Sequence, residues 1–479
     1  MPSVAVVLAA GMGTRMKSAL PKVLHPVAGK PMLLHVMDAL KEAGVEEIIV
    51  VLGHGADLVE KVLGDRASVV YQKEQLGTGH AVLQALPKLL AYGEGDCLVV
   101  CGDTPLLTGE TLSRLRKTHW ESQAQATILT ALMDEPKGYG RIIREGFPES
   151  GAGVSPAAER NEVLQGPVLA IVEEKDATFA QKGIREINTG AYCFDISWLR
   201  AGLKELKPAN AQGEYYLTDI ISFLNQRGQK VAACLAADAR ETMGINDRLQ
   251  LSQAQEYLTR RILERHMLNG VTIEDPASTL VEPGVEIGRD TVLYRGTVLT
   301  GATRIGENCQ IGPWTRLNDT AAREGARIVQ STLDGCVVGE RCNIGPYTYM
   351  RPGCELAEEV KVGGFVEAKK LKAAKGAKIP HLSYIGDATV GRRVNIGAGT
   401  ITCNYDGKNK FPTVFGDDSF VGSNTNLVAP VNIGEGAYIG AGSTITKDVP
   451  PHALAVARGH QKNIENWKQR KQQEADKER

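Results

Sequence analysis

Residues 415–445 read FGDDSFVGSNTNLVAPVNIGEGAYIGAGSTI, and this stretch decides the fold of the second half of the chain. Every sixth residue is aromatic or aliphatic, in the series Phe415, Val421, Leu427, Ile433, Ile439 and Ile445. An α-helix would repeat about every 3.6 residues, and an ordinary strand would repeat at every second residue. A strict period of six therefore predicts short strands that are joined by tight corners and stacked as a solenoid.

The same period starts much earlier in the chain. The first positions of these earlier hexads are Ile287, Leu293, Leu299, Ile305, Ile311 and Leu317, then Val338, Ile344, Met350, Leu356 and Val362, then Val390 and Ile396. The second position is most often Gly, which allows a positive φ at a corner. The fifth position is almost always small or β-branched, so each coil is expected to stack its aliphatic residue inside a thin core.

This pattern resembles the hexapeptide-repeat acyltransferases, whose fold is a left-handed parallel β-helix with three hexads in each triangular coil. The handedness is implied by the resemblance alone, because parallel crossovers in general favour the right hand.

Length and composition set wider limits. With 479 residues and a formal net charge of -1, the chain has room for two to four domains and no electrostatic reason to bind nucleic acid or an anionic membrane. No apolar run reaches the roughly 18 residues that span a bilayer, so we expect a cytoplasmic protein. Cys309, Cys336, Cys342 and Cys354 fit the fifth hexad position, so they are expected to be small interior residues.

The first half begins with a buried strand at residues 4–8, followed by the glycine-rich turn AAGMGTRM and then Pro21-Lys22. Backbone N–H groups in such a turn can approach phosphate oxygens, and Arg15 and Lys22 would add charged contacts. The motif is weak when taken alone, since a plain strand-to-helix turn would explain the same residues.

The following segments predict βαβ alternation and a parallel sheet. Residues 32–43 have the pattern of an amphipathic helix closed by Gly44, and residues 47–52 and 97–101 have the pattern of strands. Asp103 follows the last of these strands, where open α/β sheets bind ligands, so it could hold Mg²⁺. An N-cap role would explain the same residue.

Taken together, these stretches resemble the sugar-phosphate nucleotidyltransferases, whose start reads L-A-A-G-x-G-T-R-M-x(6)-P-K, here residues 8–22. Further motifs of that family recur in order, GYGR at residues 138–141, VEEKD at 172–176, EINTG at 186–190, QGEYYLTD at 212–219 and GIN at 244–246. The resemblance covers most of residues 3–246. One departure is the stretch 145–167, rich in Gly, Pro, Ser and Glu, which predicts an elongated mobile loop.

The sequence predicts four segments. They are a Rossmann-like α/β nucleotidyltransferase domain at 1–246, a connecting helix within 247–270, a β-helix domain at 271–463 and a charged tail at 464–479. Leu251, Ala254, Leu258 and Ile262 have helical spacing in the connecting segment, with Asn246 or Asp247 as a possible N-cap.

The hexads lose register at three places, at about residues 318–335, 368–389 and 402–415. We expect insertions there, forming loops on the solenoid surface, where chemistry tends to be placed. Lys369, His381, Tyr384, Asn404 and Tyr405 lie in or beside the second and third breaks. A single loop His is usually plain surface, but this one accompanies cations that suit a phosphate, and its side chain suits taking a proton from an amine.

Arg351 occupies a second hexad position, where Gly is usual, which predicts a cation on the solenoid exterior. The segments around it are similar to the acetyltransferase half of a family of bacterial bifunctional enzymes of UDP-N-acetylglucosamine synthesis. They are YMRPG at 349–353, FVEAKK at 365–370, HLSYIGD at 381–387 and NIGAGTITCNYDG at 395–407.

That resemblance implies two reactions. In the first, acetyl moves from acetyl-CoA to the amine of glucosamine 1-phosphate; in the second, UTP and N-acetylglucosamine 1-phosphate give UDP-N-acetylglucosamine and pyrophosphate. It implies these roles for acetyl transfer: His381 as general base, Arg351 and Lys369 on the sugar phosphate, Tyr384, Asn395, Asn404 and Tyr405 on the sugar and amine, and Ala398, Ser423, Ala441 and Arg458 on acetyl-CoA. It implies these roles for uridylyl transfer: Leu8, Ala9, Ala10, Gly11, Arg15 and Lys22 on the triphosphate, Gln72, Gly77 and Thr78 on uracil, Gly140, Glu173 and Asn188 on the sugar, and Asp103 and Asn246 on Mg²⁺.

Two other functions compete with this one. A nucleotidyltransferase whose β-helix serves only oligomerisation or regulation would have unbroken hexads without the His and cation cluster. A non-catalytic scaffold would lack Arg15, Lys22 and Asp103. The sequence shows neither pattern, and the family resemblance further implies a homotrimer formed through the β-helix.

Overall fold

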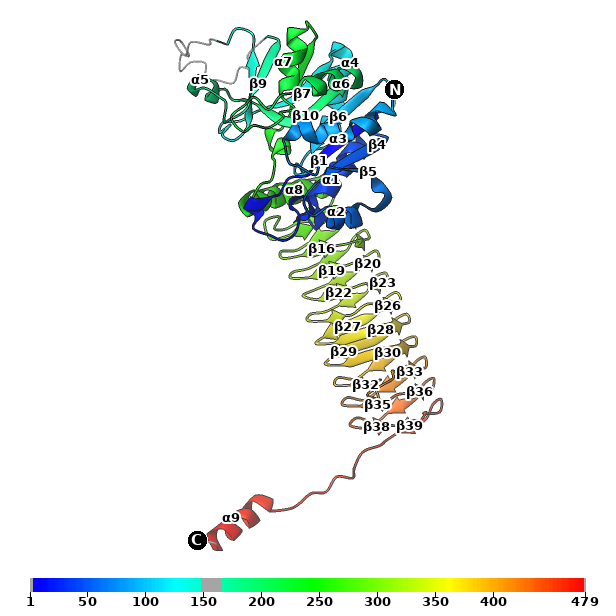
Figure 1. Ribbon diagram of the computed structural model, residues 1–479. Helices are drawn as coiled ribbons and strands as arrows, with labels where there is room; N and C mark the ends of the chain where they lie inside the picture. Colours follow the sequence, from blue (N-terminus) through cyan, green and yellow to red (C-terminus); the bar gives the residue numbers. More distant parts are fainter. Residues whose placement is uncertain (1–2, 148–165, 478–479) are drawn as a thin grey trace. The chain divides into compact units, whose positions relative to one another are not determined.

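The structure is a computed structural model that describes residues 3–147 and 166–477. The chain divides into two compact units, Met1–Leu258 and Thr259–Arg479. Most of the long loop that the sequence predicts at residues 145–167 lies outside the described residues. Each unit is described by itself below (Figure 1).

The first unit is built on a nine-stranded sheet with the order β11-β7-β10-β6-β1-β4-β5, and β8 and β9 extend from β10. Its longer strands are β1 (Ser3–Ala9), β4 (Glu47–Leu52), β5 (Ser68–Tyr71), β6 (Asp96–Cys101), β7 (Ala126–Leu132), β8 (Gly140–Arg144), β9 (Val168–Val172), β10 (Glu186–Asp195) and β11 (Val231–Leu235). A separate small hairpin pairs β2 (Pro26–Val27) with β3 (Lys30–Pro31).

The expected parallel sheet is only partly correct. Strands β6, β1, β4 and β5 are parallel, but β10 is antiparallel to both β6 and β7. In the described chain between β7 and β10, the one helix is the four-residue α5 (Phe179–Lys182), which is too short to cross over a sheet. Strands without a crossover helix between them pair antiparallel.

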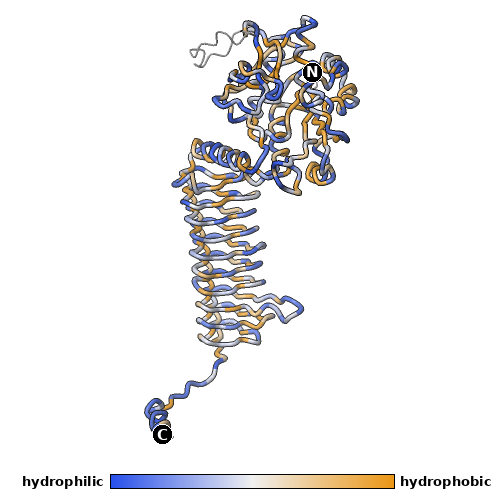
Figure 2. Tube along the Cα trace, turned by 60° about the vertical axis from the view of Figure 1, so that its left-hand side comes forward, coloured by the Kyte–Doolittle hydropathy of each residue, from blue (hydrophilic) through white to orange (hydrophobic). Residues whose placement is uncertain are grey.

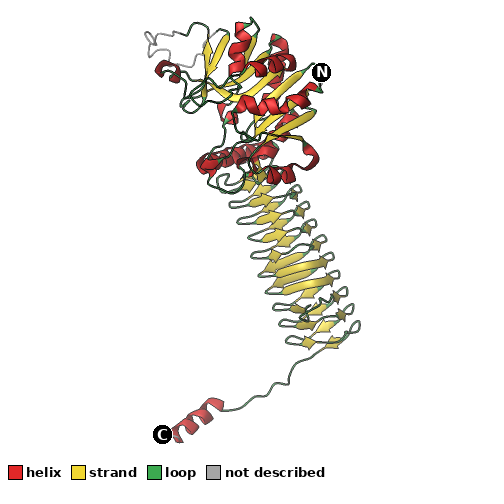
Figure 3. Cartoon of the chain, viewed as in Figure 1, coloured by secondary structure: helices red, strands yellow, loops and turns green. Residues whose placement is uncertain are grey.

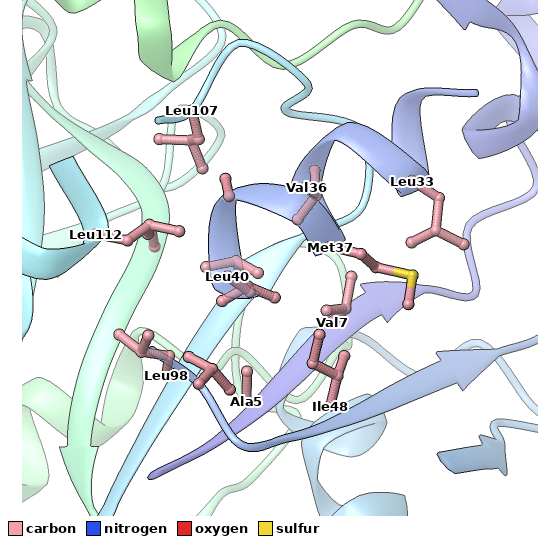
Figure 4. Packing of buried hydrophobic residues seen from close by; sticks show 14 of the residues in the cluster. Ala5, Val7, Leu33, Val36, Met37, Leu40, Ile48, Leu98, Leu107 and Leu112 are labelled. Carbon is pink, nitrogen blue, oxygen red and sulfur yellow. The ribbon is translucent and has the colours of Figure 1, made fainter. Parts of the chain in front are cut away.

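Helices cover both faces of this sheet (Figure 3). One face packs against α1 (Met32–Glu42), α2 (Ala56–Leu63) and α4 (Gly109–Ser122), and the other against α3 (Thr78–Leu90), α6 (Ile196–Glu205) and α7 (Asp219–Gln226). Figure 4 shows Val36, Met37 and Leu40 of α1 lying over Val7 of β1 and Ile48 of β4. Because alternate residues of each strand face opposite helical layers, both sides of the sheet are buried.

The helix expected at the junction is α8 (Arg248–Leu268). Asp247 caps it, since its Oδ1 accepts a hydrogen bond of 2.9 Å from the N–H of Gln250. Ala254, Leu258 and Ile262 are buried, as their spacing predicts.

The second unit is a parallel β-helix (Figure 1). Leu293 pairs with Ile311, three hexads further along the chain, so one coil returns to its starting point after three sides. The first side is a sheet of β12 (Thr272–Ile273), β15 (Val292–Leu293), β18 (Gln310–Ile311), β21 (Arg327–Ile328), β24 (Asn343–Ile344), β27 (Lys361–Gly364), β29 (Lys378–His381), β31 (Asn395–Ile396), β34 (Phe420–Val421), β37 (Tyr438–Ile439) and β39 (Leu454–Ala455).

The other two sides share one larger sheet. The second side contains β13 (Leu280–Val281), β16 (Val298–Thr300), β19 (Arg316–Asn318), β22 (Thr332–Asp334), β25 (Tyr349–Met350), β32 (Ile401–Cys403), β35 (Asn426–Val428) and β38 (Thr444–Ile445). The third contains β14 (Glu286–Ile287), β17 (Arg304–Ile305), β20 (Ala321–Ala322), β23 (Val337–Val338), β26 (Glu355–Leu356), β33 (Thr413–Phe415) and β36 (Val431–Ile433). The long strands β28 (Glu367–Ala373) and β30 (Tyr384–Val390) run along both.

The fold class expected from the sequence is confirmed for both units, and every inward hexad residue except Ile287 is buried. The four cysteines assigned to the interior are buried and free. The charged tail forms the fully exposed helix α9 (Trp467–Lys477). In the described residues, no helix is both long and apolar enough to cross a membrane.

The breaks in the hexad register were interpreted wrongly at two of three places. In residues 368–389 the coils continue, so the break consists of two corners, each shortened by one residue. The inward residues that stay buried across it are Ala368, Ala373, Ile379, Ile385 and Val390. Residues 318–335 behave in the same way, with Ala322, Ile328 and Leu333 buried. Each lost corner residue shifts the hexad register by one, while the chain stays in the stack and forms no surface loop.

The third break is a true insertion. Between β32 and β33 the chain leaves the stack, and Tyr405 and Lys410 form an isolated antiparallel bridge within the excursion. Figure 2 shows one largely hydrophilic loop that reaches out from the stack toward its C-terminal end.

Candidate active sites

In the first unit, the glycine-rich loop after β1 lies against Lys22. It continues into a short 3-10 turn, Thr14–Met16, and not into an α-helix. Gly13 has a φ of 62°, and a Cβ added there would lie 2.7 Å from the Cβ of Lys22. A glycine at this position lets Lys22 lie directly against the loop.

Four side chains from distant parts of the chain meet beside this loop, namely Arg15, Lys22, Asp103 and Asn246. The Lys22 ammonium forms an ion pair with Asp103 Oδ2 and also donates to Asn246 Oδ1 at 3.3 Å. Arg15 Nη2 donates to the same amide oxygen at 2.9 Å. The Lys22 and Asp103 side chains are only 14% and 19% exposed, so this is a partly buried cluster of two cations and two oxygen donors.

Asp103 lies just beyond the carboxyl end of β6, at the sheet edge that the sequence predicts. The N–H of Ile245 donates to the Asp103 carbonyl oxygen at 3.0 Å, which ties the segment carrying Asn246 to this edge. The N-cap of the next helix, α4, is Thr108, whose Oγ1 accepts from the N–H of Thr111. The alternative N-cap role for Asp103 is therefore wrong.

A second loop at this edge carries the residues expected at the uracil. Gln72 is buried, and its Nε2 donates to the Gly77 carbonyl oxygen at 3.0 Å. Gly77 has a φ of 106° and precedes α3, which starts at Thr78. Gln75, which the sequence reasoning did not assign, donates from Nε2 to the Ala10 carbonyl oxygen at 3.1 Å and so links this loop to the glycine-rich one.

The three residues expected at the sugar also lie together. Gly140 of β8 pairs with Asn188 of β10, and a Cβ added to Gly140 would lie 3.3 Å from Glu173 Oε2. Thr218 Oγ1 donates to Glu173 Oε1 at 3.2 Å. Burial raises the pKa of the Glu173 carboxyl group, and the negative charge of Asp176 adds to this, while the hydrogen bond from Thr218 opposes both.

In the second unit, the corner between the first and second sides collects the expected general base and the residues expected to contact acetyl-CoA. His381 and three further residues occupy the same position in successive coils, Ala398, Ser423 and Ala441. Backbone N–H groups of the following coil donate to the carbonyl oxygens of Ala398 at 2.7 Å and of Ser423 at 2.8 Å. Arg458 Nη1 donates to the Ala441 carbonyl oxygen at 2.7 Å, which places its charge at the end of this column.

The second side carries a cluster of cations. Arg351 follows β25 and pairs with Glu367 at 3.4 Å, and Lys369 lies in the next coil. Contact with the Lys410 ammonium, then desolvation and the Arg351 charge, lower the pKa of Lys369. Three cations held this close favour a multiply charged anion. Lys410 belongs to the inserted loop and was missed from the sequence, because nothing in its local pattern shows which coil the loop touches.

Tyr384 and Asn404 lie beside this cluster, on adjacent coils. A Cβ added to Gly386 would lie 2.5 Å from the Tyr384 hydroxyl oxygen and 2.7 Å from Asn404 Nδ2, so both groups crowd the same spot. Tyr405 is exposed on the inserted loop, and its hydroxyl donates to the Gly407 carbonyl oxygen at 2.5 Å.

Asn395 is not brought to this group. It lies in β31 on the first side, whereas Tyr384 lies in β30 on the second, and both are outward residues next to a buried one. Within one chain, these two side chains therefore project from different sides of the triangular coil.

Comparison with known proteins covers both units. Residues 5–152 match the MobA-like NTP transferase domain, and residues 412–447 match the bacterial transferase hexapeptide (six repeats). The chain is 54% identical over 467 residues to the Bifunctional protein GlmU of Heliobacterium modesticaldum, covering 98% of each chain. The chain belongs to the GlmU family. It is also 51% identical to the GlmU of Halalkalibacterium halodurans and 49% identical to that of Carboxydothermus hydrogenoformans, over 97% and 96% of this chain and 98% and 99% of those proteins.

Membership of the GlmU family confirms the function expected from the sequence. The chain is a bifunctional enzyme of UDP-N-acetylglucosamine synthesis, which acetylates glucosamine 1-phosphate with acetyl-CoA and transfers uridylyl from UTP to N-acetylglucosamine 1-phosphate. Both rival functions are excluded, since the likeness to GlmU proteins extends over both units.

As a GlmU nucleotidyltransferase, the first unit uses a divalent metal with its nucleotide. The described residues contain no group of three or more His, Cys, Asp or Glu that could hold an ion. The carboxylate of Asp103 and the amide oxygen of Asn246 do fit, because both contact the Lys22 ammonium and so lie within reach of one cation. Oxygen donors suit Mg²⁺, which keeps several waters and takes substrate phosphate oxygens.

Proposed function

We propose that each unit carries out one of the two transfers with the residues named above. The acetyl site consists of His381, Arg351, Lys369, Tyr384, Asn395, Asn404 and Tyr405 with Ala398, Ser423, Ala441 and Arg458. The uridylyl site consists of Leu8, Ala9, Ala10, Gly11, Arg15, Lys22, Gln72, Gly77, Thr78, Gly140, Glu173 and Asn188, with Asp103 and Asn246 as Mg²⁺ ligands.

Acetyl transfer needs a base beside the thioester. His381 takes a proton from the amine of glucosamine 1-phosphate as the amine nitrogen attacks the thioester carbonyl carbon. The C–S bond breaks, and coenzyme A leaves as a thiol once its sulfur has regained a proton. The cluster of Arg351, Lys369 and Lys410 holds the phosphate, while the corner column from Ala398 to Arg458 supports the coenzyme.

Uridylyl transfer is an in-line attack on phosphorus. A phosphate oxygen of N-acetylglucosamine 1-phosphate bonds to the α-phosphorus of UTP, and the bond to the β-phosphate oxygen breaks to release pyrophosphate. Arg15 and Lys22 offset the negative charge, and Glu173 accepts hydrogen bonds from the sugar. Mg²⁺, when bound by Asp103 and Asn246, supplies further charge neutralisation and aligns the phosphates.

We also propose a homotrimer formed through the β-helix, acting in the cytoplasm. The placement of Asn395 and Tyr384 on different sides of a coil supports it, because a second copy could bring an Asn395 to the Tyr384 of the first. A triangular solenoid offers flat sides for such packing, and homo-oligomers are commonly closed and symmetric.

The observation that carries the assignment is that each unit gathers its own cluster of the expected residues, around Asp103 in one and along the His381 corner in the other. Asp103→Ala should abolish uridylyl transfer and leave acetyl transfer intact, and His381→Ala should do the reverse. Both activities are measured on the full chain, by pyrophosphate release and by free thiol. Loss of both activities in either folded variant would contradict the assignment.

A further inference from the structure

The two oxygen donors proposed for the metal already have cationic partners from the protein itself. Asp103 Oδ2 pairs with the Lys22 ammonium, and Asn246 Oδ1 accepts from Lys22 at 3.3 Å and from Arg15 at 2.9 Å. The two contacts of Lys22 are partly buried, so water screens them less than it would screen a surface pair.

A divalent ion and the Lys22 ammonium cannot share this position without a cost. If the ion takes Oδ2, it removes the lone pairs that Lys22 uses. If it takes the other oxygen of the same carboxylate, two positive charges remain a few ångströms apart in a partly buried site, where like charges repel strongly. Metal binding at Asp103 therefore requires the ammonium to move.

The chain allows this movement in the side chain alone. The backbone at Lys22 is fixed, since Pro21 precedes it and Gly13 packs against its Cβ. Beyond Cβ, lysine is a flexible stem with a point charge, unlike the rigid fork of arginine. The glycine-rich loop proposed to hold the triphosphate is in contact with this stem, so phosphate oxygens would be the nearest new partners for the ammonium.

We propose that Lys22 competes with the divalent metal for Asp103 and transfers its ammonium from that carboxylate to the triphosphate when nucleotide binds. This inference rests on the proposed uridylyl site. It makes Lys22 the link between two binding events: the nucleotide draws the lysine away and so frees Asp103 for the metal. Coupling of this kind is reciprocal, so bound metal also releases Lys22 toward the phosphates.

An alternative role for Lys22 is purely structural, holding the Asp103 carboxylate in the orientation that the metal needs. The two roles predict opposite signs. If Lys22 competes with the metal, removing Lys22 tightens metal binding. If Lys22 holds the Asp103 carboxylate in place for the metal, removing it weakens metal binding.

The test titrates Mn²⁺ into the full chain without nucleotide, with free Mn²⁺ followed by electron paramagnetic resonance. Lys22→Met should bind Mn²⁺ about fivefold more tightly than the wild type, the fold-change for a pair worth ~1 kcal/mol. Lys17→Met removes the same charge nearby from an exposed residue, and should change the affinity by less than about twofold because an exposed charge is screened. Unchanged or weaker binding in Lys22→Met, or equal tightening in Lys17→Met, would overturn the proposal.

Two further variants complete the test. Lys22→Arg keeps a cation, so its Mn²⁺ affinity should stay near that of the wild type, and tightening as large as in Lys22→Met would show that charge is not the cause. Asp103→Ala should abolish this Mn²⁺ site in any background. If the site survives Asp103→Ala, the proposed metal ligands are wrong, and this failure is distinct from a failure of the competition itself.

Discussion

Asn404 Nδ2 donates a hydrogen bond of 2.6 Å to Asp387 Oδ2, on the neighbouring coil of the β-helix. The contact orients the Asn404 amide next to the Tyr384 hydroxyl group, over the bare backbone of Gly386. Substrate-positioning groups must be held within a fraction of an ångström to be effective. Gly386 is therefore where the acetyl site should be most sensitive to one added methyl group.

Gly386→Ala should lower acetyl transfer by roughly ten- to a hundredfold, because the new Cβ would displace Tyr384 and Asn404 by about 1 Å. Uridylyl transfer should be unaffected, since the change lies in the second unit. The measurement is the steady-state rate of thiol release at varied glucosamine 1-phosphate. Gly284→Ala is the matched control, because a Cβ there would meet its nearest atom at an ordinary 3.5 Å. Equal acetyl transfer in the two variants would contradict the prediction.

Lys410→Met should raise the KM for glucosamine 1-phosphate by about fivefold and leave kcat nearly unchanged, because it removes one of three cations around the phosphate. It should also raise the pKa of Lys369, whose lowering is caused first by contact with Lys410. The pKa is measured by NMR of the lysine side chains.

Lys408→Met is the control for this variant, since Lys408 is an exposed cation in the same inserted loop. It should change neither the KM nor the pKa of Lys369. A KM that moves equally in both variants would mean that the loop carries only a diffuse charge effect.

Most of the fold could be predicted from the sequence because its signal is periodic. Inward residues recur every six positions, and strands β1, β4 and β6 are continuous apolar runs with clear ends. The antiparallel strand β10 could not be predicted, because a buried strand has the same pattern in either direction. The shortened corners were misread as insertions because counting in sixes gives only a remainder. Between Ala368 and Val390, the loss of two residues leaves the same remainder as an insertion of four.

The candidate sites were predictable where a motif holds several residues together, as at Arg15 and Lys22. Contacts that join distant segments of the chain could not be predicted. Gln75 reaches the Ala10 carbonyl oxygen, and Lys410 reaches Lys369, through turns whose paths depend on tertiary packing. The sequence also gave no sign that Asn395 and Tyr384 face different sides, since only the coil geometry decides that.

Neighbouring carboxyl groups in the first unit should have opposite effects on stability. Burial raises the pKa of Glu173, so between its unfolded and folded pKa values the native state binds more protons than the unfolded state, and stability falls as pH rises through that range. Glu173→Gln should therefore increase the free energy of unfolding at pH 7, with no increase below the ordinary Glu range. It should also raise the KM for N-acetylglucosamine 1-phosphate roughly tenfold, because a charged acceptor is lost.

Glu174 is the matched control. Burial acts against its charge, but the hydrogen bond from the Gly138 N–H and the pairing with Arg141 at 2.8 Å outweigh this and lower the pKa. Its charged form therefore stabilises the native state above the unfolded pKa, and that contribution is lost as pH falls through the folded pKa. Glu174→Gln should decrease the free energy of unfolding at pH 7. Urea denaturation at several pH values measures both variants, and a shared sign would contradict the argument.

A site shared between copies can be tested by mixing two inactive chains. If Asn395 serves the Tyr384 of a neighbouring copy, Tyr384→Ala and Asn395→Ala chains, each deficient in acetyl transfer, should complement each other after being unfolded together and refolded. In a random trimer, a site is intact when one copy supplies Tyr384 and the next supplies Asn395, so about a quarter of the wild-type acetyl transfer should return.

Uridylyl transfer, measured in the same mixture, reports the fraction of refolded chain, because neither substitution touches the first unit. A double variant carrying both substitutions can also be refolded with wild-type chains. If sites are shared, this mixture should keep about a quarter of the wild-type acetyl transfer, for the same statistical reason. If each site lay within one chain, half of the wild-type acetyl transfer would remain. Within one chain, Asn395 projects from a different side of the coil than Tyr384. Asn395 would therefore lie outside the acetyl site if an active monomer sedimented, or if the mixture recovered no acetyl transfer.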